Sequence, residues 1–461
     1  MATSRGRAAA EETLMPELSK DETAIDADAA PRRLTTWQQI AISLYWFSTS
    51  AHWSAILIIL LQMQAAGIGG EARKGTTLGI IVLAGAFVSM VAAPVFGAWS
   101  DRVHTRLGRR RPFLIAGTIG NILGLLVLAF LPAQPGALLP YILAFCWVQF
   151  FNNLATAPYA ALIPDVVPPA QRGSASGWMG LMTMLGNAVG VGIGLAMKWI
   201  GGLPGAYILL AVIMLLGMLG TVLLVREPKP KPAPPFDYDA FRRGLVEPFR
   251  SRDFLWVFLT RLLVMLGIFT VQEFLQFYFK DVVAGGRESF PYQLFGRTLA
   301  TEAHEATSFF ALALLVGAIV SSVAAGALSD RHGRKKMVYL SGLLQGIVVI
   351  IFLFTGRFDV VVLIGLIFGL GYGAYMAVDW ALVTDVLPKA DDYAKDMGLW
   401  HIAATLPQVT AAPIAGILLD TFQKVGKHHG LPTLGYTVIF ALAFIYFALG
   451  TVLVSRIKGA R

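Results

Sequence analysis

The sequence predicts an all-α membrane protein with twelve transmembrane helices in two pseudo-symmetric six-helix bundles. Hydrophobic residues fill 56% of the 461 positions and charged residues only 14%, which is more apolar surface than a soluble chain of this length buries. Two stretches also occur twice: residues 97–102 (GAWSDR) match 326–331 (GALSDR), and 161–168 (ALIPDVVP) match 381–388 (ALVTDVLP). Because both pairs recur at a similar offset, we expect two homologous halves.

Apolar stretches long enough to cross a bilayer define the helices in chain order. A helix needs about 20 residues to span the hydrocarbon core, because each residue rises about 1.5 Å. Such stretches follow one another, six in each half, at 37–65, 77–100, 112–131, 138–163, 175–199, 205–225, 254–279, 306–328, 337–355, 360–384, 397–419 and 434–455. The polar residues 1–36 lack the apolar segment of a signal peptide and are expected to be a disordered cytoplasmic tail.

The same pattern predicts how the chain divides into parts. Residues 37–225 form the N-terminal six-helix bundle, and 254–461 form the C-terminal six-helix bundle with a short cytoplasmic tail. Residues 226–253 are expected to be a cytoplasmic linker, with a stiff proline-rich stretch followed by a short interfacial helix. Such a linker allows two rigid bundles to move relative to each other.

Charge predicts the orientation in the membrane. With a cytoplasmic N-terminus, most of the 37 lysines and arginines fall in the tails and loops of the cytoplasmic side. We therefore expect a multi-pass protein of the cell membrane, plasma or inner, with both termini cytoplasmic. The basic residues are scattered over short loops, so the formal charge of +9 requires no nucleic acid.

Redox, metal and enzymatic chemistry are not indicated by the sequence. The single Cys146 lies inside the fourth span, so an intramolecular disulfide is impossible. We find no phosphate-binding loop, no cluster of metal ligands and no nucleophile with its base. The sequence therefore predicts a protein that is not an enzyme and needs no cofactor or metal.

The duplicated loops resemble a known family. Residues 326–336 (GALSDRHGRKK) resemble the cytoplasmic loop signature of the major facilitator superfamily. The first copy, residues 97–113 (GAWSDRVHTRLGRRRPF), has a longer spacing between its Asp and Gly. That form looks like the sucrose-transporter branch, near the glycoside-pentoside-hexuronide:cation symporters.

The resemblance implies alternating access between the two halves, with these loops holding the cytoplasmic side closed. Two further aspartates end the fourth and tenth helices at the same face, where a nearby cation is expected because a helix C-terminus disfavours negative charge. Arg172 or a loop arginine is expected beside the first, and Arg334 or Lys389 beside the second. The predicted gating residues are Asp101, Arg102, Gly108, Arg109, Asp165, Asp330, Arg331, Gly333, Arg334 and Asp385.

Ionisable side chains inside the spans are the candidates for coupling, because each costs a few kcal/mol or more in the membrane. Asp379 lies six residues before Asp385, about 9 Å deeper in the tenth helix, and Arg261 lies at a similar depth in the seventh. In the superfamily, helices one, four, seven and ten line the central cavity, so the resemblance implies that these two meet. We predict proton coupling through Asp379, Arg261 and Glu273; a fixed structural ion pair is the alternative. The other intramembrane candidates are His52 and His401.

Polar and aromatic side chains share faces of these helices. A sugar presents apolar ring faces and a polar rim, so its binding site needs amides and carboxylates around aromatic rings. The predicted substrate contacts are Tyr45, Thr49 and His52 on the first span, Gln149, Asn152 and Asn153 on the fourth, Glu273 and Gln276 on the seventh, and Tyr372, Tyr375 and Asp379 on the tenth.

These observations predict a proton-coupled symporter of a sugar or glycoside of the sucrose or maltose kind. Its partners would be a small solute, protons and the lipid bilayer, and a monomer is expected to be functional. A sodium site of the melibiose type is not expected, because the second, fourth and fifth spans hold no embedded acid. The alternatives are uncoupled facilitation, a proton-coupled exporter of drugs or metabolites on the same fold, and, least favoured, a non-transporting membrane receptor.

Overall fold

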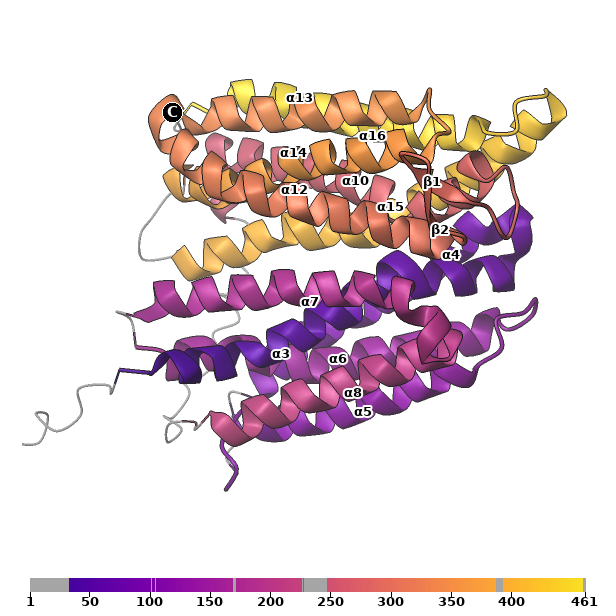
Figure 1. Ribbon diagram of the computed structural model, residues 1–461. Helices are drawn as coiled ribbons and strands as arrows, with labels where there is room; N and C mark the ends of the chain where they lie inside the picture. Colours follow the sequence, from indigo (N-terminus) through magenta and orange to yellow (C-terminus); the bar gives the residue numbers. More distant parts are fainter. Residues whose placement is uncertain are drawn as a thin grey trace, which may run out of the picture.

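The computed structural model describes residues 33–100, 102–103, 105–168, 171–225, 227, 247–386 and 393–458. Long helices run roughly parallel in two layers, the N-terminal half below and the C-terminal half above (Figure 1). Both ends of the described chain lie at one end of the bundle, which we call the terminal end. We call the opposite end, which carries a small β-hairpin, the hairpin end.

The N-terminal half begins with α3 (Thr36–Ala55), whose first turn is capped by Thr35 and Gln38 in a reciprocal capping box. The helix continues through a π-helical turn, η1 (Ile56–Leu60), into α4 (Leu61–Ser100). Gly70 has φ of 62° and divides α4, so the first crossing ends there and the second begins. The remaining helices are α5 (Arg111–Phe130), α6 (Leu138–Val166), α7 (Arg172–Ile200) and α8 (Gly202–Leu224).

The C-terminal half begins with a 3₁₀ turn, η3 (Glu247–Arg250), at the end of the predicted linker; the rest of the predicted interfacial helix lies outside the described residues. The seventh crossing is broken into α10 (Arg252–Gln272) and α11 (Leu275–Tyr278), followed by η4 (Phe279–Val283). The antiparallel strands β1 (Tyr292–Leu294) and β2 (Arg297–Ala300) form the hairpin, which the sequence analysis did not anticipate. The remaining helices are α12 (Ala303–His332), α13 (Arg334–Phe352), α14 (Phe358–Val386), α15 (Tyr393–His428) and α16 (Leu434–Leu453).

The prediction of twelve crossings in two bundles is confirmed. Among the described residues, ten helical stretches are long and apolar enough to cross a membrane, and the first of them, Thr36–Ser100, contains two crossings separated at Gly70. The other crossing is α15, which is interrupted by Pro407 and Pro413.

The two halves meet along two pairs of helices, α4 with α15 and α7 with α12. Glycines allow the backbones to approach closely at these seams. A Cβ atom added to Gly416 would lie 2.1 Å from the carbonyl oxygen of Gly75, and one added to Gly79 would lie 2.7 Å from Cα of Pro413. No larger side chain fits at this contact without separating the helices.

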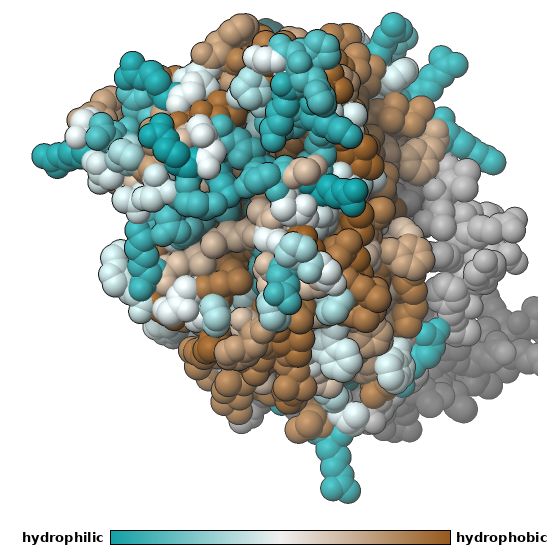
Figure 2. Space-filling view, turned by 90° about the vertical axis from the view of Figure 1, so that its right-hand side faces the viewer, coloured by the Kyte–Doolittle hydropathy of each residue, from teal (hydrophilic) through white to brown (hydrophobic). Residues whose placement is uncertain are grey.

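Large apolar side chains cover much of the outer surface of the bundle, as bilayer contact requires. Phe87, Leu123, Leu223 and Leu343 are each more than half exposed. Figure 2 shows the hairpin end, where hydrophilic side chains gather over the C-terminal half and hydrophobic ones cover the opposite part and the flank. At the hairpin end, polar side chains are therefore concentrated on the C-terminal half.

Candidate functional site

A buried ion pair joins the seventh and tenth crossings inside the C-terminal half. Nη1 of Arg261 on α10 contacts Oδ2 of Asp379 on α14, and both side chains are almost fully buried, 3% and 1% exposed. The hydroxyl of Tyr375, one turn earlier on α14, donates a hydrogen bond of 3.0 Å to Oδ1 of Asp379. The carboxylate is thus shared between a cation and a neutral donor, and Tyr372 lies half-buried one turn before Tyr375.

The depth of this pair follows from a contact between the halves near the hairpin end. Nε2 of Gln62 on α4 donates to the carbonyl of Gln272 at 3.4 Å, and its Oε1 accepts from the backbone N–H of Gln276 at 3.2 Å. From this level toward the terminal end, His52 lies about 15 Å along the first crossing and Arg261 about 16 Å along the seventh. His52 and the ion pair therefore lie at a similar depth.

The N-terminal half presents a second polar group at this depth, built around Trp53. The indole Nε1 of Trp53 donates to Oδ1 of Asn152 on α6 at 3.2 Å, and the ring of His52 packs edge-on against the indole at 4.7 Å. Both ring nitrogens of His52, the hydroxyl of Thr49 and Nδ2 of Asn152 are buried and make no hydrogen bond with the described part of the chain. Leaving such a group without a bond costs about 1–3 kcal/mol.

The broken seventh crossing adds polar groups nearer the hairpin end. Glu273 closes α10 and Phe274 leaves the helical conformation, which is why the crossing is interrupted here. The side chain of Glu273 is 4% exposed, and neither of its carboxylate oxygens has a hydrogen-bond partner within the described residues; the same holds for Oε1 of Gln276. Buried polar atoms are normally paired, so these side chains are candidates for contact with a solute.

Two of the predicted substrate contacts are engaged in packing instead. The hydroxyl of Tyr45 lies 2.8 Å from Oγ1 of Thr118 on α5, and its ring packs edge-on against Tyr159 at 5.0 Å. Asn153 donates to the carbonyl of Gln149 at 2.8 Å and accepts from Ser89 on α4 at 3.1 Å. The structure thus ties Tyr45 and Asn153 to neighbouring helices of the N-terminal half. The side chain of His401 lies outside the described residues.

At the terminal end, the first duplicated loop is fastened to two helices of its own half. Asp165 at the end of α6 accepts from Nη2 of Arg109 at 2.7 Å and from Nε of Arg110 at 3.1 Å, so loop arginines supply its cation. Glu227, just after α8, accepts from three consecutive backbone N–H groups at the start of α5, at 2.6 to 2.9 Å. Gly108 has φ of 109°, and a Cβ there would lie 2.6 Å from Oε2 of Glu227.

The other predicted gating residues are only partly described. Asp101 lies outside the described residues, as do the side chains of Asp330 and Asp385. Gly333 separates α12 from α13 with φ of 96°. Arg331 and Arg334 flank this turn, and Arg102 donates to the carbonyl of Ala98 at 2.8 Å. Their part in gating stays a prediction.

A cluster of charges fastens the halves together at the hairpin end, and we call it the lock: Glu71, Lys74, Lys280, Asp281 and Tyr436. The side chain of Lys74 is 3% exposed, and its Nζ lies 2.7 Å from Oε2 of Glu71 and 2.6 Å from Oδ2 of Asp281. Nζ of Lys280 lies 2.9 Å from Oε1 of Glu71. The hydroxyl of Tyr436 on α16 donates to Asp281 at 2.5 Å. Burial by itself would lower the pKa of Lys280, but hydrogen bonds to Glu288 and Glu71 outweigh this effect, so the pKa is raised.

Two further contacts reinforce this closure. The carboxylate of Asp420 on α15 accepts from the backbone N–H groups of Gly75 and Thr76, at 3.1 and 2.6 Å, and so caps the second crossing from the other half. Lys198 on α7 donates to Thr301 at 2.7 Å and pairs with Glu305 of α12 at 2.8 Å. The structure is therefore closed at the hairpin end.

The sequence analysis missed the lock, Asp420, Gln62 and Glu227. The lock and Asp420 have a recognisable signal: acids and bases stand together at the ends of the first, seventh and eleventh spans, on the side poor in basic residues. Within the described chain, no group of three or more histidine, cysteine or acidic residues is arranged to hold a metal ion.

Similarity to solved structures extends over almost the whole chain. A bacterial homolog of the human lysosomal transporter Spinster, in an inward-facing and unoccupied conformation, superposes with a TM-score of 0.66 at 14% identity, over 92% of this chain and 99% of that one. A mutant of the nucleoside transporter NupG gives a TM-score of 0.67 at 12% identity, over 91% of this chain and 99% of that one. At these identities the likeness shows the fold alone.

The relatives found by sequence match a smaller share of this chain than the solved structures do, but at higher sequence identity. The Arabidopsis thaliana sucrose transport protein SUC3 is 27% identical over 229 residues, 39% of this chain and 38% of the relative. The general alpha-glucoside permease of Schizosaccharomyces pombe is 27% identical over 127 residues, 25% of this chain and 23% of the permease. The chain thus matches less than two fifths of the length of either relative.

One comparison covers most of the chain at the level of a family. The family model described as "MFS/sugar transport protein" matches residues 74–455, from the second crossing to the end of the twelfth. This range contains both duplicated loops, the ion pair and most of the lock. The chain belongs to the MFS/sugar transport protein family.

Proposed function

We propose that this protein is a secondary active transporter that carries a sugar or glycoside of the sucrose or maltose kind together with a proton. The observation that carries the proposal is a set of buried polar atoms without a hydrogen-bond partner in the described chain, on the first and fourth crossings at the depth of the Arg261–Asp379 pair and on the seventh crossing about 15 Å nearer the hairpin end. Relatives named as sucrose transport proteins and an alpha-glucoside permease support the sugar class.

The proposed sugar site lies between the halves. On the N-terminal side, Thr49, His52 and Asn152 offer hydrogen-bonding atoms that have no partner within the described chain, beside the indole of Trp53. On the C-terminal side, about 15 Å nearer the hairpin end, Glu273 and Gln276 offer oxygens without a partner among the described residues, and a sugar would meet them along the same path. Hydroxyl groups of a sugar satisfy both donors and acceptors, so a bound sugar would remove the cost of these groups. We leave Tyr45 out of this site because its hydroxyl is used within the N-terminal half.

Proton coupling is assigned to Asp379. While Arg261 is in place, the buried carboxylate is stabilised as an anion. If substrate or a movement of the seventh crossing draws Arg261 away, a buried carboxylate left charged is costly, and proton uptake neutralises it. Tyr375 stays hydrogen-bonded to the same group and can hold it in position. Glu273 is the second candidate for the proton.

The closed hairpin end fits one state of an alternating-access cycle. We propose that the hairpin end faces outward and the terminal end faces the cytoplasm of a cell membrane, so the structure is closed to the outside. The moving units would be residues 37–225 and 254–461, joined by 226–253, and one chain would suffice. To open outward, the protein must break the lock and the Asp420 cap.

Uptake into proteoliposomes tests the proposal. Radiolabelled sucrose or maltose should accumulate when the lumen is alkaline and negative, and should only equilibrate without the gradient. One charge moving through 100 mV supplies about 2.3 kcal/mol, enough for a concentration ratio of roughly fifty. If neither sugar enters above the level of empty liposomes, the sugar assignment is wrong; gradient-driven efflux would indicate an exporter.

A pair of near-isosteric variants tests the site itself. Thr49→Val removes a hydroxyl that makes no hydrogen bond with the described chain, so stability should be unchanged or higher. If the hydroxyl binds sugar, the apparent affinity should fall about fivefold, since a neutral hydrogen bond contributes about 1 kcal/mol. The control is Thr183→Val on α7, whose hydroxyl donates only to its own helix. Equal affinity for both variants would remove Thr49 from the site.

A further inference from the structure

The β-hairpin turns at a residue that is unusual for its position. Leu294 pairs with Arg297 across the hairpin, so Phe295 and Gly296 make a two-residue turn, and both have positive φ, 48° and 81°. This is the backbone of a type I′ turn, whose first position favours Asn, Asp or Gly. Among the described residues other than glycine, Phe295 alone has a positive φ, which is unfavourable for so bulky a side chain. An outlier of this kind points to a function of the turn.

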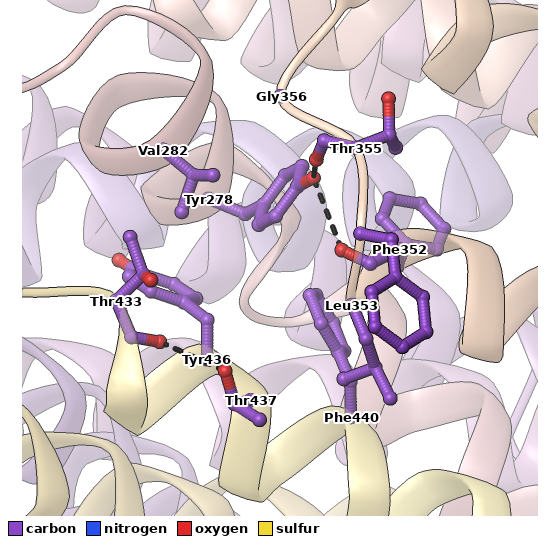
Figure 3. Close-up of a pocket in the computed structure, with 11 residues that line it drawn as sticks. Tyr278, Val282, Phe352, Leu353, Thr355, Gly356, Thr433, Tyr436, Thr437 and Phe440 are labelled. Carbon is purple, nitrogen blue, oxygen red and sulfur yellow. Dashed lines mark hydrogen bonds between the residues drawn. The ribbon is translucent and has the colours of Figure 1, made fainter. Parts of the chain in front are cut away.

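The other aromatic rings nearby belong to the core of the C-terminal half. Tyr278, Phe352 and Phe440 are at most 2% exposed, and their ring centroids lie 5.1 to 5.3 Å apart (Figure 3). The hydroxyl of Tyr278 also donates to the carbonyls of Phe352 and Thr355. Phe295, in contrast, is 83% exposed, so packing within the protein does not offset the unfavourable backbone of its turn.

The body of the hairpin is held firmly, so the exposure of its tip does not come from a loose loop. Tyr292 in β1 is 1% exposed, its hydroxyl donates to the carbonyl of Phe279 at 3.0 Å, and its ring lies 5.3 Å from that of Phe358 at the start of α14. The backbone N–H of Phe290 donates to the carbonyl of Thr301 at 2.9 Å and closes the foot of the hairpin. The turn is therefore presented at a fixed place.

The foot of the hairpin lies where transmembrane segments end. Lys198, near the end of the span Ser174–Ile200, donates to the hydroxyl of Thr301 at 2.7 Å, and the span Ala303–Ser322 begins two residues after Thr301. Trp199, the neighbour of Lys198, is 82% exposed, as in the aromatic belts found at membrane surfaces. In Figure 1 the strands lie alongside the bundle, and α4 extends beyond them. The hairpin is therefore at the level of the lipid headgroups.

The exposed side chains of the hairpin suit a lipid better than a protein partner. One phenylalanine buries at most about 250 Å², whereas a specific protein interface needs about 1,000 Å² or more. Leu299 adds little apolar surface, since it is 39% exposed. Arg297, directly after the turn, is exposed, and its side chain makes no hydrogen bond or ion pair with the described chain. A guanidinium beside an apolar ring matches the boundary between lipid phosphates and acyl chains.

We propose that the hairpin is a membrane anchor: the ring of Phe295 inserts into the leaflet at the hairpin end, and Arg297 binds the phosphate of a zwitterionic phospholipid. Residues 285–302 contain two arginines and two glutamates, so the hairpin has no net charge that would require an anionic lipid. The anchor fixes the start of α12, which packs against α7 of the other half, relative to the membrane surface. The proposal does not depend on the proposed transport function.

The first experiment measures the depth of the turn in the membrane. A nitroxide is attached through Phe295→Cys or Lys427→Cys, each with Cys146→Ser, to the full chain in phosphatidylcholine nanodiscs. Relaxation by oxygen, which concentrates in lipid, is compared with relaxation by a water-soluble nickel chelate. Lys427 is exposed near the end of α15 and serves as the reference for water.

The oxygen-to-nickel ratio should be higher at position 295 than at position 427, and added phosphatidylglycerol should not change this result. Equal ratios at the two positions would overturn the insertion. A higher ratio at position 295 only in the presence of phosphatidylglycerol would overturn the assignment to a zwitterionic lipid.

The second experiment removes the ring while a label at Thr298→Cys, in the exposed strand β2, reports the position of the hairpin. Phe295→Asn keeps the turn, because Asn is favoured there. The ratio of inserted to lifted hairpin should fall about fivefold or more, since a partly immersed phenyl ring loses its apolar contact with lipid. The control is Phe354→Asn, 84% exposed in the α13–α14 loop, which should leave the ratio unaltered. An unaltered ratio in Phe295→Asn would overturn the anchor.

A pair of arginine variants tests the phosphate contact with the same label. Arg297→Gln should lower the inserted share about twofold, as expected for an ion pair at a surface. Arg287→Gln is the matched control, because the guanidinium of Arg287 already donates to the carbonyl of Ala284 at 2.9 Å and lies over the ring of Phe290. Equal effects of the two variants would remove Arg297 from the anchor.

Discussion

Removing either member of the Arg261–Asp379 pair should destabilise the protein more than removing both. In Asp379→Ala, the guanidinium of Arg261 stays buried without that carboxylate, which costs about 3–5 kcal/mol. The hydroxyl of Tyr375 loses its acceptor as well, at about 1–3 kcal/mol. Arg261→Ala leaves the reverse charge buried.

The double variant removes both charges, so the two single losses should not add. A coupling energy of at least about 2 kcal/mol is expected from the double-mutant cycle. Free energies of unfolding in detergent solution, measured by denaturant titration of all four proteins, give this number. Arg357→Gln with Asp359→Asn is the control, since that pair lies at the surface with Arg357 76% exposed and should couple by less than about 1 kcal/mol.

Transport by the same double variant tests the role of the carboxylate. Without Asp379 the protein should exchange labelled for unlabelled sugar across the membrane, but the roughly fiftyfold accumulation on a gradient of 100 mV should vanish. Gradient-driven accumulation by the double variant would refute proton coupling at Asp379 and leave the pair a structural one. A coupling energy near zero would refute the argument from burial.

Three further substitutions act on closure and on the first duplicated loop. Lys74→Met should shift the protein toward opening at the hairpin end by at least tenfold, because Lys74 bridges two acids while 3% exposed; distances between spin labels on the two halves measure this. Gly416→Leu should block closure, because even a Cβ lies 2.1 Å from a backbone oxygen, whereas Gly192→Leu meets open space; sugar uptake by both variants would contradict this seam. Gly108→Ala should destabilise the loop by about 1–2 kcal/mol through its positive φ and the crowded Glu227 carboxylate, whereas Gly97→Ala in the same motif should be neutral; equal melting temperatures would count against the strain.

The sequence predicted the parts of the fold that depend on hydropathy and duplication. Apolar length determines where helices cross a bilayer, so twelve crossings follow directly. The break in the seventh crossing and the β-hairpin depend on local contacts with no strong sequence signal. Gln62, for example, reads as one more polar residue in an apolar run, yet it bonds to backbone groups of the seventh crossing.

The candidate site was predictable where one residue is anomalous by itself. A charge inside a span identifies Arg261 and Asp379, and their depths can be counted along the helices. Orientation around the helix axis is different: Tyr45 and Thr49 are one turn apart, yet the hydroxyl of Tyr45 contacts α5 while that of Thr49 has no hydrogen-bond partner among the described residues. Such a difference depends on how the neighbouring helices pack, which a single sequence does not specify.

The cap that Asp420 places on the second crossing makes the stability of that helix depend on the state of the whole protein. While the halves touch, the amide groups of Gly75 and Thr76 are hydrogen-bonded to a carboxylate and shielded from solvent. When they part, the same two amides lose the carboxylate that accepts their hydrogen bonds. Hydrogen–deuterium exchange at Gly75 and Thr76 would therefore record how often the protein opens, with no attached probe and no substitution.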